Sequence, residues 1–98
     1  MPTDRLRQMK ADLLKALGQP TRLKILELLA GGERCVCEIF PAIDEEQSNI
    51  SKHLAFLRAN GIVEAERRGM RVFYRLTNPQ VLKLLEGAEA CVQAVRGR

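Results

Sequence analysis

Apolar residues recur at steps of three and four along the first third of the chain, the spacing of one face of an α-helix. Residues 4–17 show this pattern and predict an amphipathic helix. Its stripe consists of Leu6, Met9, Leu13, Leu14 and Leu17. Gly18 should end this helix, and Pro20 suits the first turn of a second one. The residues that the second helix should bury are Leu23, Ile25, Leu26 and Leu29.

Two further helices are predicted in the middle of the chain. A short one covers about residues 36–42 and is interrupted by Pro41, and a turn at residues 43–45 leads to a longer one over about 46–59. The buried stripe of the longer helix is Ile50, Leu54 and Leu57. Asn60-Gly61 supplies a left-handed cap after it.

The pattern then changes from helical spacing to that of strands. Residues 62–67 and 72–76 predict two strands, and residues 68–71, which include Gly69, predict the turn of a hairpin. After Asn78-Pro79 the helical spacing returns over about residues 79–95. The apolar residues of this last helix are Val81, Leu84, Leu85, Ala88, Cys91, Val92 and Val95.

The order of elements predicts the fold class. A short helix, a tight turn, a helix with a polar face and a basic hairpin are typical of a winged helix-turn-helix. The fold is therefore expected to be mainly α with a small β-hairpin, in the order α-α-α-α-β-β-α. With 98 residues and no internal repeat, residues 1–98 are expected to form a single domain.

Charge is unevenly distributed along the chain. Residues 33–46 hold five acidic side chains against Arg34, whereas residues 52–75 hold six Lys or Arg side chains against Glu64 and Glu66. A basic block in a small domain indicates a half that binds polyanions. The chain has no apolar run near the ~20 residues of a membrane span and no signal peptide at its start, so a cytoplasmic protein without a membrane partner is expected.

The predicted fourth helix and the hairpin turn carry side chains suited to DNA. Amide and hydroxyl groups can read base edges in the major groove, and Lys and Arg can neutralise phosphates. The helix supplies Gln47, Ser48, Asn49, Ser51, Lys52, His53 and Arg58, and the turn supplies Arg67, Arg68 and Arg71. The first residues of a recognition helix normally reach the bases. Gln47, Ser48 and Ser51 are therefore the expected base-reading residues.

The same segments resemble a known family. The run Gln47–Leu57, the following Gly61-Ile62-Val63, the Arg68-Gly69 wing with Phe73-Tyr74, and the opening Ala16–Leu23 together resemble the ArsR/SmtB family of metal-responsive repressors. The resemblance implies a homodimer whose interface is formed by the helices at about 4–17 and 79–95. It also implies binding to an imperfect palindrome in double-stranded operator DNA and repression relieved by an inducer.

Two cysteines are the candidate inducer site. Cys35-Val36-Cys37-Glu38-Ile39 resembles the Cys-Val-Cys-Asp-Leu motif of the family's arsenic(III)/antimony(III) and cadmium/lead sensors. Soft ions prefer thiolates, so this chemistry is sensible for the motif, and no other cofactor is expected. Residues i and i+2 lie roughly 200° apart on an ideal helix. One ion could therefore bind both sulfurs only if the start of the short helix deforms, which would couple inducer binding to loss of DNA geometry.

Arsenic(III) or antimony(III) is the expected inducer, and cadmium(II) or lead(II) is an alternative, because the chain departs from the family's patterns. Phe40 stands where arsenic sensors often have a third cysteine, and the start of the chain lacks the cysteines of cadmium/lead sensors. Zinc sensing through the last helix is not expected, because that helix offers only Glu86 and Glu89. His53 is interpreted as a DNA-contacting or packing residue.

Cys91, on the apolar stripe of the last helix, is the remaining thiol. Its position favours a packed core residue. The alternatives are a third metal ligand, or a partner for Cys35 or Cys37 in a disulfide or polysulfide switch, because some members of the family sense persulfides or oxidants with a cysteine on the last helix. A thiol-redox repressor is therefore an alternative to the metal-responsive one.

An enzyme is not expected. The Cys-x5-Arg phosphate loop of arsenate reductases is absent, because the sixth residues after the three cysteines are Pro41, Ile43 and Gly97. The chain also has no His/Asp partner set and no Gly-rich nucleotide loop. A winged helix that contacts only proteins is a further alternative, against which the arginine-rich wing argues.

Overall fold

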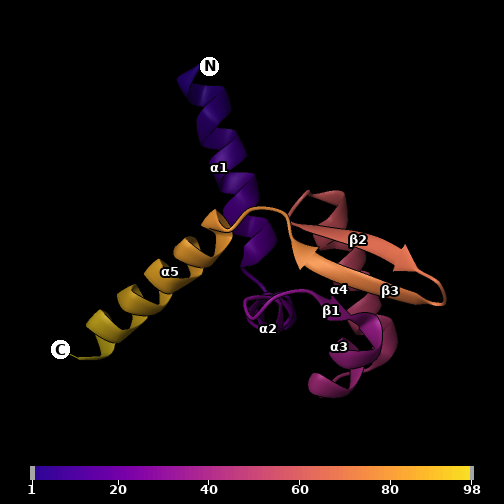
Figure 1. Cartoon of the computed structure of the whole chain (residues 1–98). Helices are drawn as coiled ribbons and strands as arrows, with labels where there is room; N and C mark the ends of the chain where they lie inside the picture. Colours follow the sequence, from indigo (N-terminus) through magenta and orange to yellow (C-terminus); the bar gives the residue numbers. More distant parts are fainter. Residues whose placement is uncertain (1, 98) are drawn as a thin grey trace.

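The structure is a computed structural model, and it describes residues 2–97. Four helices precede a β-hairpin and one helix follows it, as the sequence predicts (Figure 1). In chain order the elements are α1 (Thr3–Leu17), α2 (Pro20–Leu29), β1 (Arg34–Cys35), α3 (Val36–Ala42), α4 (Gln47–Ala59), β2 (Val63–Arg68), β3 (Arg71–Leu76) and α5 (Gln80–Arg96). The predicted bounds agree with these to within one or two residues.

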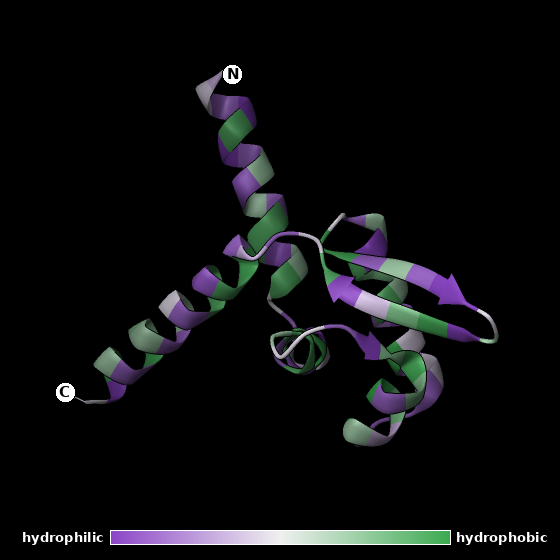
Figure 2. Ribbon diagram, viewed as in Figure 1, coloured by the Kyte–Doolittle hydropathy of each residue, from purple (hydrophilic) through white to green (hydrophobic). Residues whose placement is uncertain are grey.

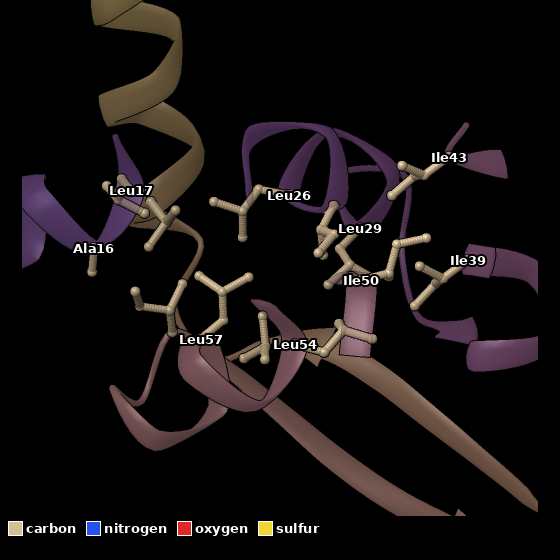
Figure 3. Close-up of a cluster of buried hydrophobic side chains, with 13 residues drawn as sticks. Ala16, Leu17, Leu26, Leu29, Ile39, Ile43, Ile50, Leu54 and Leu57 are labelled. Carbon is tan, nitrogen blue, oxygen red and sulfur yellow. The ribbon is translucent and has the colours of Figure 1, made fainter. Parts of the chain in front are cut away.

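The core lies where α2, α3 and α4 meet the sheet, and these elements are called the body below (Figure 3). The predicted stripe of α4 is confirmed, because Ile50, Leu54 and Leu57 are all buried. In α2 the buried residues are Ile25, Leu26 and Leu29, whereas Leu23 is half-buried. Pro41 is expected from the sequence to interrupt the short helix, but α3 continues through it and ends at the next residue, Ala42. Pro41 thus lies in the last turn of the helix.

The sheet has one strand more than the sequence predicts. Its order is β1-β3-β2, and β1 pairs with β3 in antiparallel register through Arg34↔Tyr74 and Cys35↔Phe73. A strand of two residues shows no alternation, so its sequence carries no strand signal. The β2–β3 hairpin, called the wing, turns through Gly69-Met70 with Gly69 at φ 61°, where glycine is favoured.

Helices α1 and α5 diverge away from the body and are called the arms (Figure 1). Only their body-proximal ends are buried, at Ala16 and Leu17 of α1 and Val81 of α5. The large apolar side chains that the arms expose are Leu6, Met9, Leu14, Leu84, Val92 and Val95. Figure 2 shows green, hydrophobic segments along both helices. Among residues 2–97, no helix combines the length and the hydropathy needed to cross a bilayer.

Candidate nucleic-acid interface and cysteine pair

The exposed face of α4 presents several of the predicted DNA-reading side chains to solvent. Gln47, Ser48 and Ser51 lie at its N-terminal end and are exposed, as are Lys52 and Arg58. The buried residues of the same helix face the core, so the polar residues necessarily occupy the opposite side. This geometry offers one amide, two hydroxyls and two positive charges on the exposed side of α4.

Asn49 belongs to a different environment from its neighbours. Its side-chain amide donates to Glu45 at 2.7 Å, and Glu45 also accepts from the buried hydroxyl of Thr21, at 2.6 Å and 2.7 Å to its two carboxylate oxygens. Lys24 reaches the same carboxylate at 3.3 Å. The hydrogen bond from Thr21, followed by Lys24 and Asn49, lowers the pKa of Glu45. This cluster joins the start of α2 to the turn before α4.

His53 is also held from α2. Arg22 donates through Nε to His53 Nδ1 at 3.1 Å, stacks 3.6 Å from the centroid of the Phe56 ring, and donates to the carbonyl of Ala16 at 3.1 Å. Because Nδ1 accepts, this geometry assigns the proton of neutral His53 to Nε2. Burial, followed by the charge of Arg22, lowers the pKa of His53. Arg22 therefore fixes how α1 and α4 sit against α2.

The arginines of the wing fall into two groups. Arg67 and Arg71 are exposed, and within residues 2–97 neither has an ion-pair partner. Arg68 instead binds Glu33 with both terminal nitrogens, at 2.6 Å and 2.7 Å, and binds Glu66 through Nε at 3.0 Å. Within residues 2–97, the wing arginines whose charge is unpaired are therefore Arg67 and Arg71, and not Arg68.

Arg75 extends the ion pairs around Arg68 into a network. It contacts Glu64 at 2.8 Å, Glu66 at 3.2 Å and Glu33 at 3.6 Å. The hydrogen bond and charge of Arg68, together with Arg75, lower the pKa of Glu66, and the carboxylates raise the pKa of both arginines. These five side chains form one network of ion pairs.

Cys35 and Cys37 come together at the start of α3. Cys35 is the N-cap residue, with extended φ −67° and ψ 144°, and Cys37 is the second residue of the helix. Their Cα atoms are 5.1 Å apart and their sulfurs are joined in a disulfide. The backbone N–H of Cys37 donates to Cys35 Sγ at 3.1 Å. Cys35 is buried and Cys37 exposed.

This geometry corrects the expectation that the helix must deform for both sulfurs to bind one ion. The expected separation of roughly 200° applies only when both residues are helical. Cys35 lies before the first helical turn, and its extended backbone directs its sulfur toward that of Cys37. A capping box also stabilises this start, since the Glu38 carboxylate accepts from Cys35 N–H at 2.9 Å. The two sulfurs therefore meet on an intact α3.

Within residues 2–97, Cys91 does not join this pair. It lies on α5, which runs away from the body, and it is exposed rather than packed in the core (Figure 1). Within residues 2–97 no three Cys, His, Asp or Glu side chains gather in an arrangement able to hold a metal ion. The interpretation of Cys91 as a core thiol is therefore wrong for a single chain, and as a third ligand from the same chain it is not in place.

Several residues that position the site were not predicted from the sequence. Thr21, Arg22 and Glu45 orient α4, and Glu33 and Arg75 hold the wing. Thr21 carried a usable signal, because a polar residue stands there within an otherwise apolar helix face. The other four are surface-type charged residues, and each of them has a partner 24 or more positions away in the chain.

Comparison with known proteins agrees with this architecture. Residues 19–65 match the family described as "Bacterial regulatory protein, arsR family". The arsenical resistance operon repressor of Escherichia coli (strain K12) is 41% identical over 86 residues, covering 83% of this chain and 73% of the relative.

Two solved structures extend the likeness to nearly the whole chain. The crystal structure of Rv0081 from Mycobacterium tuberculosis superposes with a TM-score of 0.82 at 35% identity, covering 94% of this chain and 93% of that one. The solution structure of the homodimeric winged helix-turn-helix domain of Mb0332 from Mycobacterium bovis gives a TM-score of 0.75 at 38% identity, covering 96% and 83%. The chain belongs to the ArsR family of winged helix-turn-helix transcriptional regulators.

Proposed function

We propose that this protein is a homodimeric repressor that leaves its operator when arsenite or antimonite binds Cys35 and Cys37. The observation that carries the proposal is the convergence of the two sulfurs at the N-cap of α3, in a regulator whose next helix presents a polar face. Thiophilic ions bind thiolates in preference to oxygen ligands, and two adjacent sulfurs form a chelate.

DNA contact in this proposal is divided between α4 and the wing. Gln47, Ser48 and Ser51 reach base edges in the major groove, where amides and hydroxyls discriminate between base pairs. Lys52 and Arg58 neutralise phosphates beside them, and Arg67 and Arg71 do so from the wing. Asn49 and His53 orient the helix rather than read bases, since both are engaged with the body.

The arms supply the dimer interface in this proposal. Their exposed apolar residues are stabilised when another surface buries them, and α1 and α5 each provide one long apolar stripe for such contact. The homodimeric relative from Mycobacterium bovis supports assembly of this kind. Two-fold symmetry then places two copies of α4 about one DNA turn apart, ~34 Å, on an imperfect palindrome.

Titration of the reduced protein bound to DNA tests the inducer. The operator is first selected from random duplexes, and binding is followed by fluorescence anisotropy as arsenite is added. Operator affinity should fall about fivefold or more, the usual size of an allosteric coupling. Cys35→Ser/Cys37→Ser should bind the operator and ignore arsenite, whereas release of this double variant would contradict the proposal.

Further titrations identify the inducing ion and test whether Cys91 is a ligand. Antimonite, cadmium and lead, added separately, identify which thiophilic ion acts at the lowest concentration. Cys91→Ser should respond to arsenite as the wild type does if two protein sulfurs suffice. A weaker metal affinity in Cys91→Ser would instead assign a ligand role to this cysteine, supplied by the partner copy.

The adjacency of the two sulfurs favours a second candidate, a thiol-redox repressor. Hydrogen peroxide would oxidise the Cys35 and Cys37 thiols to a disulfide and would itself be reduced to two water molecules, taking up the two thiol protons. The adjacency of the sulfurs permits this reaction within one chain. Peroxide would then release the wild type from DNA while arsenite would not.

A further inference from the structure

The cysteine pair and the wing share one sheet. Cys35 pairs with Phe73 and Arg34 pairs with Tyr74, so the strand that carries the first cysteine lies on one edge of β3. The other edge of β3 pairs with β2 from Val63↔Leu76 to Arg68↔Arg71. A change in position at Cys35 can therefore reach β3, the central strand of the sheet, without passing through α3 or α4.

Side chains make a second connection between the same two regions. Glu33 lies two residues before Cys35, and its carboxylate forms a two-pronged ion pair with Arg68 at the far end of β2. The Arg68 guanidinium also stacks 4.6 Å from the centroid of the Phe73 ring, the residue that pairs with Cys35. Arg68 thus lies where the cysteine segment, β2 and β3 meet.

The geometry of this contact distinguishes it from an ordinary surface ion pair. Isolated exposed pairs contribute little, but bidentate arginine–carboxylate pairs within a network of charges contribute more. The Glu33 side chain is 28% exposed and that of Arg68 46%, so both are partly shielded from solvent. The contact is strong enough to hold the hairpin and accessible enough to be broken.

We propose that Glu33 is a positioning residue that transmits inducer binding at Cys35 and Cys37 to the wing. This inference rests on the proposed function. The structure shows Glu33 holding Arg68 while the two sulfurs are bonded to each other. In the reduced protein the same contact fixes the wing beside α4. When an ion binds both sulfurs, the segment ending at Cys35 shifts, Glu33 releases Arg68, and Arg67 and Arg71 lose their alignment with the phosphates. The helix-turn-helix itself stays folded.

Glu33 and Glu66 form a matched pair for the test. Both carboxylates bind Arg68, and Glu33→Gln and Glu66→Gln each remove one negative charge beside it. Glu66 lies within β2, so of these two carboxylates it is that of Glu33 that joins the wing to the cysteine segment. A purely electrostatic role would make the two variants behave alike, whereas the proposed role separates them.

The measurement is the ratio of operator dissociation constants with and without saturating arsenite, for the reduced full-length protein. The wild type and Glu66→Gln should show a ratio of about fivefold or more, and Glu33→Gln a ratio below about twofold. Arsenite binding to the DNA-free proteins, followed by thiolate–arsenic ultraviolet absorption, should be equal in all three. Arg68→Lys should resemble Glu33→Gln, because an ammonium group cannot form the two-pronged contact.

The outcomes distinguish the role of Glu33 from the proposed function. A wild type released by arsenite together with an equally responsive Glu33→Gln and Arg68→Lys would overturn the role of Glu33 and leave the proposed function intact. A wild type that arsenite does not release would overturn both. Equal loss of response in Glu33→Gln and Glu66→Gln would also reject the proposal, since it would point to the charge around Arg68 alone. Should Glu33→Gln unfold, Arg68→Lys carries the same comparison.

Discussion

The body and the arms of this chain contain similar apolar stripes but differ in what covers them. In α4 the stripe is fully buried, with Ile50 and Leu57 at 0% exposed. In the arms the same helical spacing leaves Leu14 58% and Val92 57% exposed. The same periodicity therefore marks a core within one chain in the body. In the arms it marks a surface that needs a second chain to cover it.

The difference shows how this small domain separates its tasks. The body closes its own core, so it can hold α4 and the wing in a fixed relation. The arms contribute only their ends to that core, and the rest of each helix is available for assembly. Changes in the body should therefore alter folding and DNA reading, whereas changes in the arms should alter oligomeric state.

The largest effect is expected from a cavity in the body. Ile50→Ala removes a fully buried side chain between α2 and α4 and should lower the free energy of unfolding by about 2–5 kcal/mol. Urea unfolding followed by circular dichroism measures the change. Met70→Ala, at a wing residue 95% exposed, is the control and should change stability by less than about 0.5 kcal/mol. Equal losses in the two variants would refute the division between buried and exposed apolar residues.

A charge in the arms should break assembly while sparing the body. Leu14→Glu or Val92→Glu places a carboxylate on the apolar face of α1 or α5. Sedimentation should then show monomers, and operator affinity should fall about 100-fold or more through loss of the second binding half. Val92→Ile keeps the face apolar and should remain dimeric. Dimers that persist in both glutamate variants would show that the arms do not form the interface.

A smaller effect should distinguish free from held side chains within α4. Gln47→Ala should weaken specific operator binding by about 1–3 kcal/mol and leave binding to random duplexes unchanged. Asn49→Ala should instead lower the free energy of unfolding by about 1 kcal/mol, because Asn49 bonds to Glu45. Competition anisotropy and urea unfolding report the two quantities. If Asn49→Ala instead weakened specific operator binding without lowering the free energy of unfolding, Asn49 would have to leave Glu45 and read a base.

The smallest effect should appear on acidification. The folded protein lowers the pKa of His53 below its usual 6.5, so the unfolded chain takes up this proton first. Stability from His53 is therefore complete above pH about 6.5 and declines as pH falls toward the folded pKa. The melting temperature should decrease over this window, and His53→Gln should reduce the decrease. Glu45 and Glu66, whose pKa values are lowered from 4.5, act only in a more acidic window.

The sequence by itself determined the elements and their order. Periods of 3.6 and 2 follow from backbone geometry, so Ile50, Leu54 and Leu57 could be assigned to a buried face before any contact was known. The turn at Gly69 is local too, and local features depend on few neighbours. The meeting of the Cys35 and Cys37 sulfurs on an intact helix was not predicted, because the expectation placed Cys35 within the helix rather than at its N-cap. The polar end of α4 followed from the same periodicity.

Tertiary structure decided which of the predicted residues are free. Arg68 looks like Arg67 and Arg71 in the sequence, but Glu33 reaches it across 35 positions of chain. Asn49 and His53 look like neighbouring DNA-reading residues, and contacts from Glu45 and Arg22 hold them. The pairing of β1 with β3 likewise joins the cysteine segment to the wing. Such pairings join residues that are distant in the sequence and are brought together only by the tertiary fold. The pattern of polar and apolar residues along the chain does not specify them.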